Sequence, residues 1–161
     1  MKKIFQIVVY FLLLGTSASK AGDFNFAIGN FDYSDKGKRA TMLDLTYGFS
    51  ENKTSSFLGE IVPVFGAFVT ADSAAMLYSG AKIDYKFGSF VISPSFTPGI
   101  YSKGDGKDLG HTIEFKSQIN VGFNIGSDTN FSVGYSHVSN ASLGDKNPGA
   151  NSYSFNFLTR F

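Results

Sequence analysis

Strict alternation of apolar and polar residues is the clearest pattern in this chain, and it is longest between residues 113 and 125. One side of this segment carries Ile113, Phe115, Ile119, Val121, Phe123 and Ile125, with Ser117 as the interruption. The other side carries Glu114, Lys116, Gln118, Asn120, Gly122 and Asn124. Because successive side chains of a β-strand point to opposite faces, the pattern predicts a strand with one apolar and one polar face.

The same alternation recurs along the chain and predicts eight strands. Their expected ranges are 23–31, 40–49, 56–70, 75–87, 89–101, 111–126, 129–138 and 151–161. Eight is an even number, as single-chain bacterial barrels require. In a membrane barrel the apolar faces meet lipid and the polar faces line the lumen. We therefore expect an all-β fold, an eight-stranded antiparallel transmembrane β-barrel of the outer membrane, whose narrow lumen is packed with polar side chains.

The connections between these strands alternate in length, as they do in outer-membrane barrels. Long polar segments are expected at 32–39, 102–110 and 140–150, and tight turns at 88–89 and 126–129. The connection at 71–74 is shorter than this pattern predicts, and the one at 50–55 is longer. Pro63, Pro94 and Pro98 fall within the third and fifth expected strands, where a missing N–H normally confines proline to edges or bulges.

The first 21 residues have the composition of a signal peptide. Lys2 and Lys3 precede an apolar run from Ile4 to Leu14, and small residues end the segment at Ala21. We expect cleavage after Ala21, so that residues 22–161 form one barrel domain. Without the three lysines of residues 1–21, 11 basic and 13 acidic residues leave a net charge of −2, which excludes the broad basic surface of a nucleic-acid binder.

The remaining composition supports the same fold. The chain has no cysteine, so neither a disulfide framework nor thiolate chemistry is available to an exported protein of this sequence. It contains 18 phenylalanines, 8 tyrosines and 18 glycines without a helical period, which favours an all-β protein.

Polar residues that are able to carry chemistry lie at the end of the seventh expected strand. His137 and Ser139 lie two residues apart, so their side chains share one face of the strand, where an imidazole is able to accept a hydroxyl proton. Counting back by twos reaches Tyr135, Val133 and Phe131, so this face is the apolar one. A nucleophile and its base are therefore predicted on the lipid-facing side of the barrel.

The segment from His137 to Ala141, followed by Asn147-Pro148-Gly149 and a closing aromatic strand, resembles the outer-membrane lipid A 3-O-deacylases of the PagL type, within the acyloxyacyl-hydrolase-like group. The segment 101–111 and the pair Glu114-Phe115 add to the resemblance, which extends from about Phe57 to the last strand. It implies an esterase that removes an ester-linked acyl chain of lipid A, the 3-O chain by family, at the outer leaflet of a Gram-negative outer membrane.

The resemblance also implies the roles of the site residues. Ser139 corresponds to the nucleophile, His137 to the base, and Asn151 falls where the family has an acidic residue. An asparagine oxygen is able to hold the imidazole tautomer but adds no charge. Asp145 and Glu114 are the alternative acids. Asn147 matches a family asparagine and is the first candidate for the oxyanion hole, with Asn140 as the second; the chemistry requires no metal and no cofactor.

Two further features suggest partners. Phe161 ends an alternating aromatic strand, which resembles the signal read by the barrel assembly machinery of the outer membrane. Lys103 and Lys107 are candidates for contact with lipid A phosphates, whereas His111 has no visible partner and is interpreted as structural. The sequence leaves the oligomeric state open.

Two other functions remain compatible with the sequence. A non-catalytic structural or adhesive barrel would retain the motif without the acid. A soluble periplasmic lipid-binding barrel would turn its apolar faces into a ligand cavity.

Overall fold

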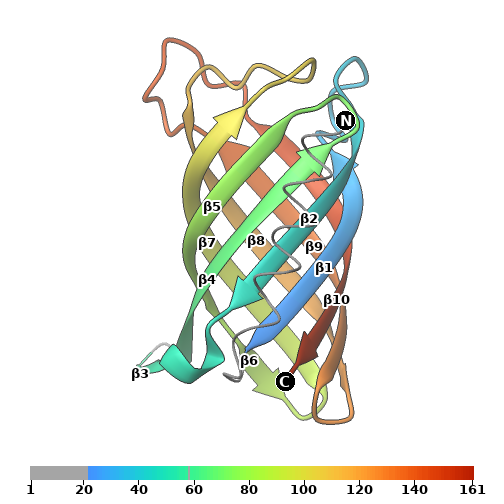
Figure 1. Ribbon diagram of the computed structural model, residues 1–161, viewed down its shortest axis with the longest axis vertical. Helices are drawn as coiled ribbons and strands as arrows, with labels where there is room; N and C mark the ends of the chain where they lie inside the picture. The colour runs from blue at the N-terminus through green and yellow to red at the C-terminus, as the bar shows by residue number, and fades with distance from the viewer. Residues whose placement is uncertain (1–21, 58) are drawn as a thin grey trace.

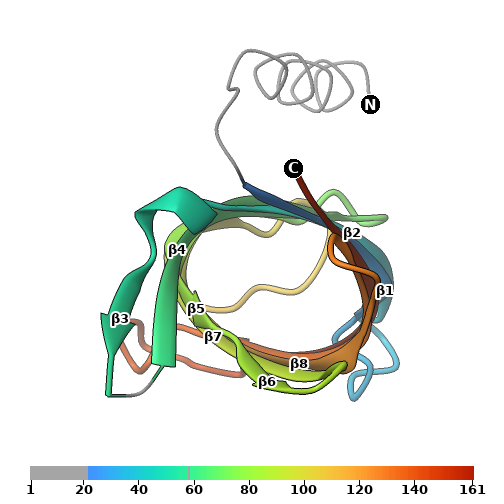
Figure 2. The same ribbon diagram turned by 90° about the horizontal axis from the view of Figure 1, so that it is seen from below.

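The chain folds as a closed antiparallel β-barrel in the computed structural model, which describes residues 22–57 and 59–161 (Figures 1 and 2). The eight long strands are β1 Asp23–Phe31, β2 Ala40–Gly48, β4 Gly59–Thr70, β5 Ala75–Ile83, β7 Phe90–Ser102, β8 Ile113–Ile125, β9 Thr129–Ser139 and β10 Ala150–Arg160. Strand β1 pairs with both β2 and β10, and β2 pairs with β4, so the sheet closes on itself. The predicted fold class and strand number are confirmed. The predicted signal peptide, residues 1–21, lies outside the described residues.

Three short elements lie at the end of the barrel that holds the C-terminus (Figure 1). The 3-10 helix η2 Ser50–Asn52 and strand β3 Thr54–Ser56 fill the connection from β2 to β4, and β6 Tyr85–Phe87 pairs with the beginning of β7. The opposite end holds the connections at 32–39, 71–74, 103–112 and 140–149. We call this the loop end. No helix among the described residues is long and apolar enough to span a membrane.

The prolines within the strands lie where the hydrogen-bonding ladder is interrupted. Strand β7 pairs with β5 at Gly99 and again at Phe96, and Pro98 lies in the gap between them. Pro94 lies at the next gap, where the expected strand 75–87 is divided at Asp84 into β5 and β6. Proline has no N–H to donate, so each gap follows from the residue type. The prediction of one continuous strand over 75–87 was wrong for this reason.

The outer surface of the strands is apolar. Its exposed side chains include Phe26, Ile28, Leu43, Leu77, Phe96, Ile119, Phe123, Phe131, Val133, Phe155 and Phe157. Phe155, for example, is 72% exposed. A water-soluble protein rarely exposes so large an apolar area, whereas a transmembrane barrel presents it to lipid. The fold is therefore a transmembrane β-barrel, and the alternative of a soluble barrel with inward apolar faces is wrong.

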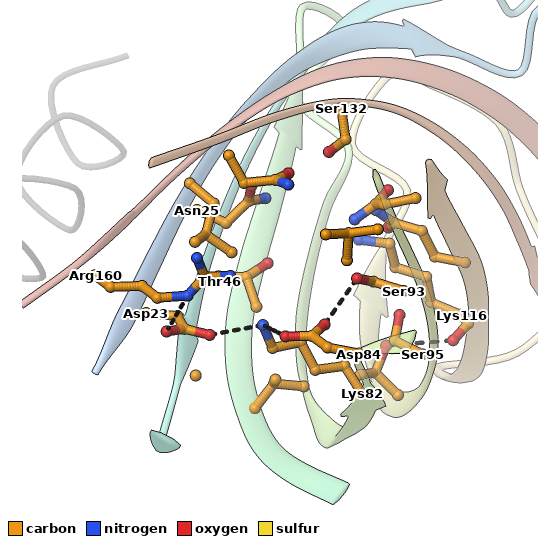
Figure 3. A pocket seen from close by; sticks show the side chains of 18 of the residues that line it. Asp23, Asn25, Thr46, Lys82, Asp84, Ser93, Ser95, Lys116, Ser132 and Arg160 are labelled. Atoms are coloured by element: carbon orange, nitrogen blue, oxygen red, sulfur yellow. Dashed lines mark hydrogen bonds and ion pairs between the residues drawn. The ribbon is translucent and has the colours of Figure 1, made fainter. Parts of the chain in front are cut away.

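The interior is divided into an apolar half and a polar half. The half at the loop end is an apolar cluster of Phe31, Met42, Phe68, Ala74, Met76, Tyr78, Tyr101, Leu109, Val138 and Ala150. The other half holds a polar cavity of about 60 Å³ (Figure 3). There Lys82 Nζ lies 2.7 Å from Asp23 Oδ2 and 3.1 Å from Asp84 Oδ2. The expectation of a polar lumen is correct only for this half, because inward positions near the loops carry large apolar residues.

An ion pair lies between the two halves. Lys116 Nζ donates to Asp44 Oδ2, and the Tyr78 hydroxyl donates to the other oxygen of the same carboxylate. The Lys116 ammonium also lies 4.4 Å from the centroid of the Tyr78 ring, a cation–π contact. Both side chains of the ion pair are almost fully buried. Each charge therefore depends on the other for its solvation.

Replacing Lys116 with methionine is expected to destabilise the barrel by about 3 kcal/mol or more, because the Asp44 carboxylate would remain buried without its cation. The effect is measurable as a lower midpoint of urea unfolding in detergent, followed by circular dichroism. Lys146→Met is the control, since Lys146 forms an exposed pair with Asp108 and such pairs contribute little. Equal midpoints for the two variants would contradict this account of the buried pair.

Candidate active site

The candidate site lies on the outer face of the barrel where β9 ends and β10 begins, at the loop end (Figure 1). The register of these antiparallel strands places His137 directly beside Asn151 and Tyr135 beside Tyr153. The side chains of His137, Tyr135 and Tyr153 are exposed, and that of Asn151 is partly buried. These residues therefore lie on the face that the strand alternation turns toward lipid.

A hydrogen bond joins His137 to Asn151. The imidazole Nδ1 lies 2.8 Å from the Asn151 Oδ1. An amide oxygen only accepts, so in this arrangement Nδ1 carries the hydrogen and Nε2 retains its lone pair. This is the tautomer in which a histidine is able to act as a base through Nε2.

Ser139 lies two residues beyond His137 on the same outward face, and its side chain is partly buried. Its register partner on β8 is Phe115, while the partner of His137 on that strand is Ser117. Within the described residues, no hydrogen bond joins the Ser139 hydroxyl to the imidazole. Contacts between a nucleophile and its base are often loose before substrate binds, so the arrangement places the two groups on one face without yet joining them.

A tight turn follows Ser139. The N–H of Leu143 donates to the carbonyl of Asn140 at 3.0 Å, and Ala141 and Ser142 both have positive φ, 51° and 66°. Positive φ at both central residues defines a type I′ turn, which is strained for residues other than glycine, asparagine or aspartate. Such strain is often found beside functional groups.

Asn140 holds this turn in place and is fully buried. Its Nδ2 donates to the carbonyls of Leu109 and Lys146, each at 2.8 Å, and its Oδ1 accepts from the N–H of Ser142 at 2.9 Å. Both hydrogens of Nδ2 are therefore already donated within the protein. This corrects the expectation that Asn140 donates in an oxyanion hole, and the residue instead links the loop 140–149 to the loop 103–112.

Asn147 remains a candidate for the oxyanion hole. Its Oδ1 accepts from the backbone N–H of Asn140 at 3.1 Å, which orients the amide, and its side chain is exposed. Its Nδ2 has no hydrogen-bond partner among the described residues. An oriented amide with a free N–H is the kind of donor that an oxyanion requires.

Gly149 forms the surface against which the His137 ring lies, a contact that the sequence analysis missed. A Cβ at position 149 would lie 2.8 Å from His137 Cε1 and 3.3 Å from Nε2. Gly149 also has φ 61°, which disfavours any L side chain. The sequence analysis used Asn147-Pro148-Gly149 as part of the family resemblance, and the structure adds that its glycine leaves room for the imidazole.

Gly149→Ala is therefore expected to displace the imidazole and to lower ester hydrolysis by about 10-fold or more, since small misplacements of reacting groups are costly. The measurement is kcat/KM on a chromogenic ester or on lipid A in detergent. Gly126→Ala is a matched control: Gly126 also has positive φ, but nothing lies within 4 Å of its added Cβ. Equal losses in both variants would show that backbone strain, rather than the displaced imidazole, is responsible.

Tyr135 is a second residue that the sequence analysis missed as part of the site. Its hydroxyl donates to Asn151 Oδ1 at 2.9 Å, so this oxygen accepts from two side chains. The Tyr135 ring lies 5.4 Å from the Tyr153 ring, which lies 4.5 Å from that of Tyr33. The available signal was its position two residues before His137 on the same face.

Neither alternative acid is a hydrogen-bond partner of His137 among the described residues. Glu114 is fully buried inside the barrel, and neither carboxylate oxygen has a partner among the described residues. Its side chain therefore lies on the opposite side of the sheet from the outward-facing imidazole. Asp145 is exposed in the loop 140–149, and the hydrogen-bond partner of His137 Nδ1 is Asn151.

The loop lysines differ in their surroundings. Lys107 Nζ lies 2.6 Å from Asp32 Oδ2 and is mostly buried, so the hypothesis of its contact with lipid A phosphates is not supported. Lys103 is exposed and lies 3.8 Å from Asp108. The hydrogen bond from Lys146 lowers the pKa of Asp108, which is also hydrogen-bonded to the Gly110 N–H.

His111 lies two residues before β8, and its Nδ1 accepts from the Ile113 N–H at 3.0 Å. This contact is consistent with a structural role. Among residues 22–57 and 59–161, no group of three or more histidine and acidic side chains is arranged to hold a metal.

Comparison with solved structures shows which proteins share this fold. The outer membrane enzyme PagL superposes with a TM-score of 0.65 at 19% identity, covering 85% of this chain and 98% of that one. A de novo designed transmembrane β-barrel (TM-score 0.55, 8% identity, 90% and 98% covered) and Neisserial surface protein A (0.51, 12%, 88% and 96%) share the fold. A search of curated protein sequences gave no significant match.

The fold and these likenesses define a small outer-membrane-type β-barrel. The family is given by the sequence itself, since residues 26–160 match the family model of the lipid A 3-O-deacylases (PagL). The chain belongs to the lipid A 3-O-deacylase (PagL) family.

Proposed function

We propose that this protein is an outer-membrane lipid A deacylase that hydrolyses an ester-linked acyl chain, the 3-O chain by family, with Ser139 as nucleophile and His137 as base. The observation that carries this proposal is the hydrogen bond of 2.8 Å between His137 Nδ1 and Asn151 Oδ1 on the lipid-facing surface. It leaves Nε2 unprotonated on the face that also carries Ser139.

The reaction follows from these positions. The Ser139 hydroxyl attacks the ester carbonyl while His137 Nε2 accepts its proton. The sugar hydroxyl then leaves with that proton, and an acyl-serine remains. Water attacks the acyl-serine with His137 again as the base, which releases the fatty acid and restores Ser139. The Asn147 amide is the proposed donor to the oxyanion that forms in both steps.

The position of the site favours a substrate in the outer leaflet. Ser139 ends a membrane-spanning strand, and the adjoining loop 140–149 lies at the loop end. In bacterial outer-membrane barrels the longer loops face the cell exterior, where lipid A forms the outer leaflet. Cleavage of residues 1–21 as a signal peptide and insertion by the barrel assembly machinery, with Phe161 as part of its signal, complete the proposal.

The direct test is mass spectrometry of lipid A from Gram-negative cells that express the chain, compared with cells that carry the empty vector. The expected result is a species lighter by one hydroxyacyl chain, at the mass of 3-O-deacylation. Membrane fractionation checks that the protein is in the outer membrane. A change in its migration on detergent gels after heating shows that it was folded before heating. Unchanged lipid A with folded protein in the outer membrane would overturn the proposal.

A non-catalytic barrel is the second candidate, and one observation favours it. Asn151 supplies no negative charge to the imidazole, unlike the acidic residue that the family resemblance implies at this position. A protein of this kind would leave lipid A unchanged under the same conditions.

A further inference from the structure

Asn151 has an ambiguity that a carboxylate would not have, because its side chain ends in one acceptor and one donor. With Oδ1 toward His137, as in the structure, the imidazole carries its hydrogen on Nδ1. If the amide turned over, Nδ2 would donate to Nδ1, and the hydrogen of the neutral imidazole would move to Nε2. Nε2 would then be unable to accept the serine proton, so the base would be lost.

Tyr135 favours one of these two orientations. Its hydroxyl donates to Asn151 Oδ1 at 2.9 Å, beside the bond of 2.8 Å from His137 Nδ1, so the oxygen accepts two hydrogen bonds. If the amide turned over, the Tyr135 hydroxyl would accept from Nδ2 and its own hydrogen would lose its acceptor; because a phenol is a better donor than acceptor, this orientation is disfavoured. At a lipid-facing surface little water is available to replace the lost bond.

We propose that Tyr135 is a positioning residue, which fixes the amide of Asn151 in the orientation that makes His137 a base. This inference rests on the proposed function for its effect on catalysis, but the orientation itself is independent of it. Tyr135 acts through Asn151 and is not proposed to contact the reacting atoms. Its role exists because position 151 carries an amide, since either oxygen of a carboxylate would accept from the imidazole.

The surroundings hold the Tyr135 hydroxyl in place. Tyr135 lies on β9 directly beside Tyr153 of β10, and their ring centroids are 5.4 Å apart. The Tyr153 ring lies 4.5 Å from that of Tyr33, whose backbone N–H donates to the Asn151 carbonyl at 2.9 Å. The two strands and the beginning of the loop 32–39 thus support both partners of the hydrogen bond.

The first measurement is the tautomer of His137, read from the ¹⁵N chemical shifts of its ring nitrogens in detergent micelles. His137→Gln identifies the signals, because His111 is the other histidine of the chain. We expect the form protonated at Nδ1 in the wild type and a mixture with the form protonated at Nε2 in Tyr135→Phe. Tyr153→Phe is the matched control and should leave the tautomer unchanged, since Tyr153 has no hydrogen bond to Asn151.

The second measurement is deacylation by Tyr135→Phe in two backgrounds. With Asn151 present, the loss of one neutral hydrogen bond is expected to lower kcat by roughly 3- to 10-fold. In the Asn151→Asp background, where orientation is no longer ambiguous, the same change should cost less than about 2-fold. A general loss of rigidity would give equal falls in the two backgrounds.

Equal falls in both backgrounds, or an unchanged tautomer in Tyr135→Phe, would overturn the inference. If the wild type proves inactive on lipid A, the proposed function fails, while the ¹⁵N shifts still decide whether Tyr135 orients the amide. Migration of each variant as a folded barrel on unheated detergent gels shows that the comparison is between folded proteins.

Discussion

Ser139→Ala is expected to lower the rate of lipid A deacylation by about 10⁴- to 10⁶-fold, the loss found when a serine nucleophile is removed from a hydrolase. No acyl-serine forms without the hydroxyl, and the remaining groups only orient the ester and polarise its carbonyl. The variant should fold normally, because the Ser139 side chain has no hydrogen bond among the described residues and is only partly buried. Single-turnover hydrolysis in mixed micelles gives the rate directly.

A second serine lies beside His137, and replacing it is the control that tests which serine is the nucleophile. Ser117 of β8 is the register partner of His137 and is exposed on the same outward face. If Ser139 is the nucleophile, Ser117→Ala should change the rate by less than about 3-fold, as expected of a surface substitution. Loss of activity in Ser117→Ala with retention in Ser139→Ala would assign the nucleophile to β8 and contradict the proposed mechanism.

The strands were predictable from the sequence because the alternation has the period of a strand and continues over many residues. The side that faces lipid was predictable from the position of the aromatic residues. The apolar half of the interior was not, because Met42 and Val138 occupy positions that the pattern assigns to the polar face. The break at Asp84 was also missed, since it depends on Pro94 of the neighbouring strand.

In the candidate site, the sequence predicted which residues share a face but not what each contacts. His137 and Asn151 lie side by side because their strands are adjacent and antiparallel and both residues fall on the outward face. The buried contacts of Asn140 depend on how the loops 103–112 and 140–149 fold over one another, which no periodicity encodes. The contact of Gly149 with the imidazole has the same origin. The catalytic roles themselves remain predictions.

Asn151→Asp is expected to increase deacylation, by roughly 10- to 100-fold if a hydrogen bond to a charged acceptor replaces one to a neutral acceptor. The substitution keeps the length of the side chain, so an oxygen should remain at the position that now lies 2.8 Å from His137 Nδ1. The carboxylate would stabilise the imidazolium that forms when the base accepts the serine proton. The larger penalty known for an amide in a serine triad arises when the tautomer is wrong, and here it is right.

The comparison with Asn151→Leu separates charge from orientation. Leucine offers no acceptor, so the imidazole tautomer is no longer fixed, and we expect kcat/KM to fall by about 10-fold or more relative to the wild type. A rise with aspartate and a fall with leucine would show that the amide orients the base and that charge limits the rate. A fall with leucine and no change with aspartate would mean that orientation alone is sufficient, and Asn151 would then be a full substitute for the acid in this barrel. If neither variant changed the rate, His137 would not act through Asn151, and the proposed base would have to be abandoned.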